Sequence, residues 1–191
     1  MLDNSYAPSA FNRFVNLDGV EDRIIYYLLS PNKKTPEELE QTHIIWKLLY
    51  YNDADALNRE LPTYQQITSL ICSDDITQSD KRIFRSPHFE DAWTTESTIL
   101  KIYIDQIIPT DRYKAVVNFG IDIITHNKCI NINPSDDDKV YPVDTVDGVE
   151  IPITGKSRVS TLLKAVLFLL NGAHVQGVGN LEFSTMMSRF Q

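Results

Sequence analysis

The chain has 191 residues, of which 42% are hydrophobic and 23% charged, and its formal net charge is −8 at pH 7. This composition is typical of a soluble globular protein that buries a core of its own. Two cysteines are too few for a disulfide framework and favour a reducing compartment. The Lys and Arg residues are scattered along the chain, which disfavours tight binding to the phosphates of nucleic acids. The longest apolar run, Ala165–Leu170, is far shorter than the roughly 20 residues of a membrane span, so no membrane partner is expected. The N-terminus lacks the pattern of a signal peptide.

The first 18 residues are expected to form an extended arm. They lack helical or strand periodicity but carry three aromatic residues, Tyr6, Phe11 and Phe14. A freely solvated tail rarely carries so many aromatic side chains. We therefore expect the arm to lie on the body of the protein or on a neighbour, and these three residues are candidate interface residues.

Three helices are predicted in the first part of the chain. Residues Val20–Leu29 form a short one, which Ser30-Pro31 ends. The next begins at Thr35, because Thr35 and Glu38 have the spacing of a capping box, and it ends near Tyr51. A third is expected over Thr63–Cys72, with an apolar side that faces the core.

Two polar segments are predicted to be loops. Residues 73–95 are rich in turn formers but hold three spaced aromatic residues, which indicates a loop pinned by anchors. Residues 131–140 contain three successive aspartates, which are usual in a solvated loop and could also meet a basic patch on a neighbour. These loops supply the other candidate interface residues: Phe84, Phe89, Trp93, Asp136, Asp137 and Asp138.

The clearest pattern is period-two alternation over Tyr113–Thr125, which predicts a strand. The preceding segment, Ser97–Ile108, alternates as well, and the short turn between them predicts antiparallel pairing. In the strand Ser97–Ile108, one face is expected to carry Leu100, Ile102, Ile104 and Ile108. Val116 and Ile124 are apolar exceptions on the outer face of the second strand, which indicates that this face is covered too.

The remaining elements complete an α+β fold. Asp147-Gly148 predicts a tight hairpin turn, and Arg158–Leu170 predicts a helix with a broad apolar face that ends at Asn171-Gly172. This helix is expected to lie on the apolar face of the main strand. A last strand is predicted over Asn180–Phe190.

The expected organisation is one α+β domain over residues 19–191. Its N-terminal helices occupy about residues 19–72, and an antiparallel sheet packed against one long C-terminal helix occupies about residues 97–190.

The strongest superficial chemical motif is Thr154-Gly155-Lys156-Ser157, between a strand and a helix. Phosphate-binding loops use such a Gly-Lys-Ser turn, but they need a second glycine at the position of Glu150. A carboxylate there repels phosphate. A glycine turn followed by a serine helix cap is therefore the favoured interpretation, and nucleotide binding is the alternative.

No metal, cofactor or catalytic site is predicted. His126 and Cys129 have metal-ligand spacing but lack nearby partners, and Cys72 is expected in the core or at a helix end. The three aspartates lack the alternating spacing of a calcium loop. The nucleophile elbow pattern G-x-S-x-G is absent, so the chain is expected not to be an enzyme.

Several segments together carry a family resemblance. They are KRIFRSPHFEDAWTTEST, ILKIYIDQIIP and AVVNFGIDIITHN, followed after a long loop by RVSTLLKAVLFLLNG and GVGNLEFSTMMSRF. In this order they resemble the neck, or head–tail joining, proteins of tailed bacteriophages, which include connectors, adaptors and tail terminators. The resemblance covers Lys81–Phe190.

The resemblance implies a non-enzymatic structural protein of the virion, assembled in the host cytoplasm. Such a protein forms a closed homo-oligomeric ring, sixfold or twelvefold, and contacts neighbouring neck, portal or tail proteins. DNA passes through the ring without specific binding, and an acidic subunit would keep DNA from adhering to the channel wall. Two alternatives remain open at this point: a small nucleotide-binding enzyme that uses Gly155-Lys156-Ser157, and a generic intracellular protein-binding adaptor.

Overall fold

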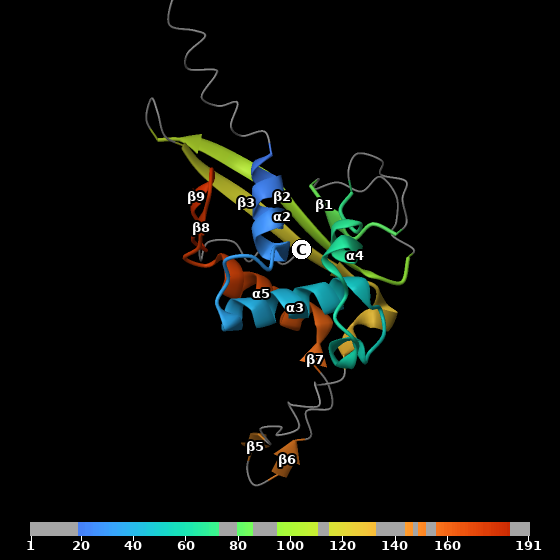
Figure 1. Cartoon of the computed structure of the whole chain (residues 1–191). Helices are drawn as coiled ribbons and strands as arrows, with labels where there is room; N and C mark the ends of the chain where they lie inside the picture. Colours follow the sequence, from blue (N-terminus) through green and yellow to red (C-terminus); the bar gives the residue numbers. More distant parts are fainter. Residues whose placement is uncertain are drawn as a thin grey trace, which may run out of the picture.

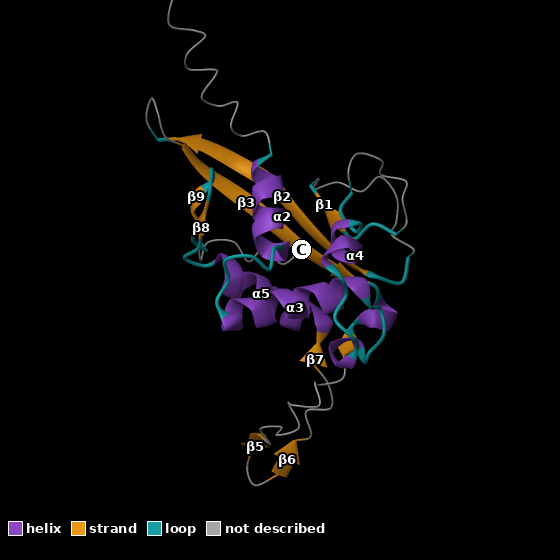
Figure 2. Cartoon of the chain, in the orientation of Figure 1, coloured by secondary structure: helices purple, strands orange, loops and turns teal. Residues whose placement is uncertain are grey.

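The computed structural model describes residues 19–72, 80–85, 95–110, 115–132, 144–146, 149–151 and 156–183. Their centre is a mixed sheet in the order β1-β2-β3, formed by Ile83–Phe84, Thr98–Pro109 and Ala115–Thr125. Three helices cover one face of this sheet: α2 (Val20–Leu29), α3 (Pro36–Tyr50) and α5 (Arg158–Leu170). Figures 1 and 2 show the long β2–β3 pair beside these helices. The predicted α+β class is confirmed.

The first two helices begin and end as the sequence predicts. The Thr35 hydroxyl accepts a hydrogen bond from the Glu38 backbone N–H at 3.2 Å, and the Glu38 carboxylate accepts one from the Thr35 N–H at 2.7 Å. At the end of α2, Trp46 Nε1 donates to the Leu29 carbonyl at 3.1 Å. Lys34 Nζ donates to the Leu28 carbonyl at 2.9 Å. Two side chains therefore satisfy carbonyls that a helix end leaves unpaired.

The third predicted helix is shorter than expected. A short 3₁₀ turn, η3 (Ala56–Asn58), precedes α4, which covers only Tyr64–Thr68. The chain then turns, and the Leu70 carbonyl accepts hydrogen bonds from the backbone N–H groups of Arg82 and Ile83. The prediction of a helix to Cys72 was wrong because these backbone groups pair with the β1 segment instead.

Strand β1 lies inside the segment that was predicted to be a loop. It pairs in parallel with β2, with Ile83 opposite Leu100, so the sheet is mixed rather than wholly antiparallel. A two-residue strand gives no alternation to detect in the sequence. The prediction for the rest of residues 73–95 lies largely outside the described residues.

The antiparallel pairing of β2 and β3 is confirmed, with a register from Thr98 opposite Thr125 to Pro109 opposite Ala115. The register shifts between Ile104 and Gln106, so Asp105 is an extra residue in β2. A bulge of this kind inverts the alternation of faces. Ile108 therefore pairs with Val116 on the outer face, and the prediction that it shares a face with Leu100 was wrong.

Helix α5 packs on the inner face of β3, as predicted. The main core also holds Leu100 and Ile102 of β2, and Phe119, Ile121 and Ile123 of β3 pack against it. The helix contributes five buried apolar residues to this core: Leu162, Ala165, Val166, Leu169 and Leu170. The Ser157 hydroxyl accepts from the Ser160 N–H at 3.5 Å and caps the start of the helix. Gly172, with a φ of 76°, follows its end.

The chain after α5 differs from the prediction. Instead of one strand over Asn180–Phe190, it forms a hairpin of β8 (His174–Val175) and β9 (Gly179–Asn180). Gly177, with a φ of 81°, allows the turn between them. Residues 181–183 belong to no strand, and residues 184–190 lie outside the described part of the chain.

Two further strand pairs complete the described fold. Strand β4 (Asn131–Ile132) pairs with β7 (Lys156–Ser157), which leads directly into α5. Strand β5 (Asp144–Val146) pairs with β6 (Val149–Ile151), with Val146 opposite Val149. The second pair confirms the hairpin that Asp147-Gly148 predicts.

One buried charge connects three parts of the core. Arg158, the first residue of α5, is 0% exposed. Its Nε donates to the Cys129 carbonyl at 2.7 Å, and its Nη1 donates to the carbonyls of Leu48 at 2.9 Å and Tyr51 at 2.6 Å. Its Nη2 donates to the Asp53 carbonyl at 2.6 Å. One guanidinium thus joins the C-terminal end of α3 to the segment before β4.

Lys34 gives the fold a pH dependence that can be tested. Burial lowers the pKa of this ammonium to about 8, although nearby Glu38 acts in the opposite direction. In the unfolded chain the pKa returns to about 10.4. Between these values the unfolded state binds more protons than the folded state, so the free energy of unfolding gains a contribution that rises with pH.

We expect this contribution to vanish in Lys34→Met. Urea denaturation between pH 7 and 9.5 measures the effect. The upper limit is 9.5 because burial raises the pKa of Tyr27, whose titration changes the stability in the opposite direction above about pH 10. The stability difference between wild type and variant should change in favour of wild type as the pH rises. A difference that stays constant over this range would contradict the assignment to Lys34.

Candidate assembly interface

The outward side of α5 carries apolar side chains that the core does not use. Leu163 is 39% exposed and Phe168 is 54% exposed, although both lie in a helix whose other face is fully packed. A helix with only one buried face normally places polar residues on the other. This exposed surface is therefore a candidate contact region.

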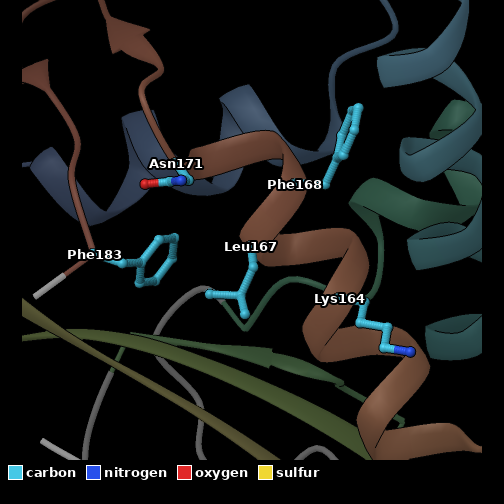
Figure 3. Close-up of a pocket in the computed structure, with 5 residues that line it drawn as sticks. All are labelled: Lys164, Leu167, Phe168, Asn171 and Phe183. Carbon is cyan, nitrogen blue, oxygen red and sulfur yellow. The ribbon is translucent and has the colours of Figure 1, made fainter. Parts of the chain in front are cut away.

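Part of this surface is a shallow depression of about 490 Å³. It is lined by Lys164, Leu167, Phe168 and Asn171 of α5 and by Phe183, which follows β9. Figure 3 shows the Phe183 ring directed toward Leu167, while Phe168 projects from another side of the helix. Phe183 is 43% exposed, so its ring forms a wall of the depression without closing it. We call these five residues the α5 depression.

A second apolar surface lies at the far end of the β2–β3 hairpin. Ile107 is 39% exposed, Ile108 is 41% exposed and Val116 is 51% exposed. Consecutive strand residues point to opposite faces, so Ile107 and Ile108 lie on the two faces of this strand pair. The bulge at Asp105 decides that Ile108 is the one on the outer face, with Val116. Figure 1 shows this end extending beyond α2. We call Ile107, Ile108 and Val116 the hairpin tip.

The long strand β3 also presents an edge. Its partner in the sheet is β2, and in the described ranges no strand pairs with its other edge. Over Ala115–Thr125 it carries a single charged residue, Asp122, and no proline. Edges of this length are usually protected by charges, prolines or a covering segment. The edge is thus another place where a second chain could pair.

The outer face of the sheet is covered only in part. Ile99 is buried there with Phe84 and Cys72. Farther along, Val116 and Ile124 are exposed at 51% and 37%. The described residues therefore do not cover these two side chains, and cover by a neighbour stays a prediction.

Of the nine predicted interface residues, the structure describes one, Phe84. Its ring is 5% exposed and packs with Cys72 and Ile99, so it anchors β1 within the chain. An interface role for Phe84 stays a prediction. The other eight lie outside the described residues: Tyr6, Phe11, Phe14, Phe89, Trp93, Asp136, Asp137 and Asp138.

The described candidate chemical residues make local contacts within the fold. Cys129 is buried, and burial raises the pKa of its thiol, which disfavours the reactive thiolate. His126 Nδ1 accepts a hydrogen bond from the Lys128 N–H at 3.3 Å. Within the described residues, no group of three His, Cys, Asp or Glu side chains could hold a metal ion. Of the Gly-Lys-Ser turn, Ser157 caps α5, whereas Gly155 lies outside the described residues.

The sequence indicates a covered face at Val116 but does not single out the other residues of the two apolar surfaces as contact candidates. The sequence predicts the broad apolar face of α5, but nothing in a single sequence separates the buried part of that face from the exposed part. In the hairpin tip, the bulge at Asp105 decides which of Ile107 and Ile108 lies on the face of Val116, and the sequence pattern does not reveal this bulge.

Comparison with known proteins places the chain in a family. Residues 43–190, which hold the second half of α3, the sheet and α5, match the YomW family model. The chain belongs to the YomW family. YomW is a phage-associated family, so the protein is phage-related. No curated protein and no solved structure matches the chain.

The YomW match begins inside α3 and leaves α2 outside it. Both the hairpin tip and the α5 depression lie within the matched region. Among the described helices of this YomW chain, none has the length and apolar character needed to cross a membrane.

Proposed function

We propose that this YomW-family protein is a structural virion protein of a tailed phage, a ring-forming subunit of the head–tail connector through which DNA passes. The observation that carries the proposal is the pair of separate apolar surfaces on one small chain, the hairpin tip and the α5 depression. Single exposed apolar residues are ordinary, but grouped ones mark contact sites. Membership in a phage-associated family supports an assembly within the phage.

The physical reason for assembly is burial of these side chains. Full burial of one large aliphatic or aromatic side chain contributes about 1.5–3 kcal/mol, and each surface offers several that are only half-buried. Two different surfaces on one chain can join copies head to tail, and such contacts produce closed rings when the rotation between subunits closes. A sixfold or twelvefold ring is the expected product.

The acidic charge of the chain fits a conduit for DNA. A net charge of −8 repels phosphates and lowers non-specific adhesion to a channel wall. In this account the protein has no catalytic role, and its partners are further copies and the adjoining neck, portal or tail proteins.

The experiment that tests this proposal is native mass spectrometry of the purified full-length chain at several concentrations. We expect a single closed oligomer of six or twelve copies, with few open intermediates. A chain that stays monomeric at every concentration, and alongside its neck partners, would overturn the proposal. A single 1:1 complex with a host protein would instead favour the adaptor alternative.

A further inference from the structure

We propose that Asn171 is a deamidation site that the native fold protects, and that local opening of the chain after α5 exposes it to reaction. Asn171 and Gly172 form the turn that ends α5, and both residues are exposed. An asparagine followed by glycine is the pair most prone to deamidation, because glycine has no side chain to hinder attack by its own backbone nitrogen. Ring assembly plays no part in this reaction.

The reaction needs only water as a co-reactant. The Gly172 nitrogen loses its proton and attacks the Cγ carbon of the Asn171 side chain, which forms a five-membered succinimide ring and releases ammonia. Water then opens the ring at either of its carbonyl carbons. The products are aspartate, in which the amide has become a carboxylate, and isoaspartate, in which the backbone runs through the side-chain carbon.

The native conformation opposes ring closure in two ways. The Gly172 N–H donates a hydrogen bond to the Leu181 carbonyl at 2.9 Å, so the attacking nitrogen is already engaged. Asn171 has a ψ of 118°, which turns the Gly172 nitrogen away from the Asn171 side chain about the Cα–C bond. Ring closure requires both groups on the same side of this bond. The rotation would break the pairing with Leu181, so the reaction requires the segment to open.

The described contacts that hold this segment closed are local. The Leu181 N–H donates to the Ala173 carbonyl at 2.8 Å, and the Leu181 side chain packs against the main core. Arg23 of α2 donates from Nη1 to the carbonyl of Gly177, in the turn between β8 and β9, at 2.8 Å. Figure 1 shows this hairpin at the margin of the domain, beside α2. A hairpin of two-residue strands held in this way can open while the core stays folded.

Deamidation makes the opening irreversible. A carboxylate at position 171 lies at the C-terminal end of α5, where the helix dipole disfavours negative charge. Isoaspartate lengthens the backbone between α5 and β8 by one carbon atom, so the Gly172 N–H loses its register with the Leu181 carbonyl. Asn171 also lines the α5 depression together with Phe183 (Figure 3). The modification therefore changes the charge of that surface permanently.

Peptide mass spectrometry of the full-length protein, incubated at mildly alkaline pH with and without urea, tests the proposal. In urea, Asn171 should deamidate faster than Asn118 and Asn180, which are followed by phenylalanine and leucine. In the folded protein, Asn171 should react at least about tenfold more slowly than in urea. Asn171→Gln should abolish the aspartate and isoaspartate products, because glutamine closes a larger ring much more slowly.

Two further variants separate local opening from global unfolding. Arg23→Met removes the contact with Gly177 and should raise the reaction rate of Asn171 in the folded protein by roughly two- to tenfold. Trp46→Phe is the matched control, because it weakens the core and removes a hydrogen bond to Leu29, away from the β8–β9 hairpin. It should lower the global stability in urea denaturation and leave the rate at Asn171 unchanged.

Several results would overturn the proposal. Equal rates at Asn171 with and without urea would show that the fold gives no protection, and an Asn171 that reacts no faster than Asn118 in urea would remove the site. If Arg23→Met leaves the rate unchanged, the hairpin does not control it. If Trp46→Phe raises the rate in proportion to its loss of global stability, the reaction proceeds from the unfolded chain and local opening is wrong.

Discussion

Replacing Arg158 with alanine should cost the fold about 3–5 kcal/mol in the free energy of unfolding, because two buried and two part-buried charge-assisted hydrogen bonds to backbone carbonyls are lost at once. Typical domains have only about 5–15 kcal/mol in total. The acceptors belong to Leu48, Tyr51, Asp53 and Cys129, so the loss should loosen the end of α3 and the start of α5 together. Urea denaturation followed by circular dichroism measures the change.

Two further variants separate geometry from charge. Arg158→Lys keeps a cation but has a compact ammonium in place of the planar fork, so we expect it to recover only part of the loss. Arg59→Met removes an exposed arginine that pairs with Asp53 and Asp55 and should have a much smaller effect. An Arg158→Ala protein as stable as wild type would show that water replaces the guanidinium at no cost.

Trp46→Ala should lower the free energy of unfolding by about 3–5 kcal/mol, the usual range for removing a large aromatic side chain from a core. The Trp46 side chain is 4% exposed and packs 5.7 Å from the His43 ring and 5.9 Å from the Tyr64 ring, between centroids. Its Nε1 also donates to the Leu29 carbonyl, so the substitution removes a cap from α2 as well as core volume.

The matched variant Trp46→Phe separates these two contributions. It retains much of the aromatic packing and loses the hydrogen bond, so we expect a loss nearer 1–2 kcal/mol. Tyr26→Ala, on the exposed side of α2, should change stability by less than about 0.5 kcal/mol. A Phe variant as unstable as the Ala variant would mean that the hydrogen bond, rather than the packing, dominates.

The sequence predicted well those elements of the fold that a few adjacent residues determine. The capping box at Thr35 and Glu38, the hairpin at Asp147-Gly148 and the stop at Asn171-Gly172 each depend on a few adjacent residues. The pairing of β2 with β3 followed from alternation and a short turn. These features require no information about distant parts of the chain.

The missed features depend on long-range pairing. Strand β1 forms because the backbone of Leu70 and Leu100 lies beside Arg82 and Ile83, and neither contact can be read from a two-residue strand. The bulge at Asp105 became apparent only from the register with β3. The role of Arg158 is another case, because its acceptors come from residues more than 100 positions away as well as from Cys129.

The candidate interface residues also divide into those that local sequence indicates and those that depend on long-range packing. Aromatic residues in polar segments predicted contacts in the arm and the loops, and those predictions lie almost entirely outside the described residues. The apolar surfaces that the structure describes depend on packing. Helix α5 carries more apolar side chains than the core buries, and the β2–β3 pair extends past α2, so that Ile107 and Ile108 remain exposed. Both exposed surfaces are thus set by long-range packing, which adjacent residues in the sequence do not reveal.

The central claim is that this chain forms a ring at the junction of head and tail. Cryo-electron microscopy of phage particles that carry this protein with a bulky tag tests it most directly. The account predicts additional density at the neck, repeated with sixfold or twelvefold symmetry about the tail axis. The account would be contradicted if the phage with the tagged protein remains infectious and its purified particles contain none of that protein.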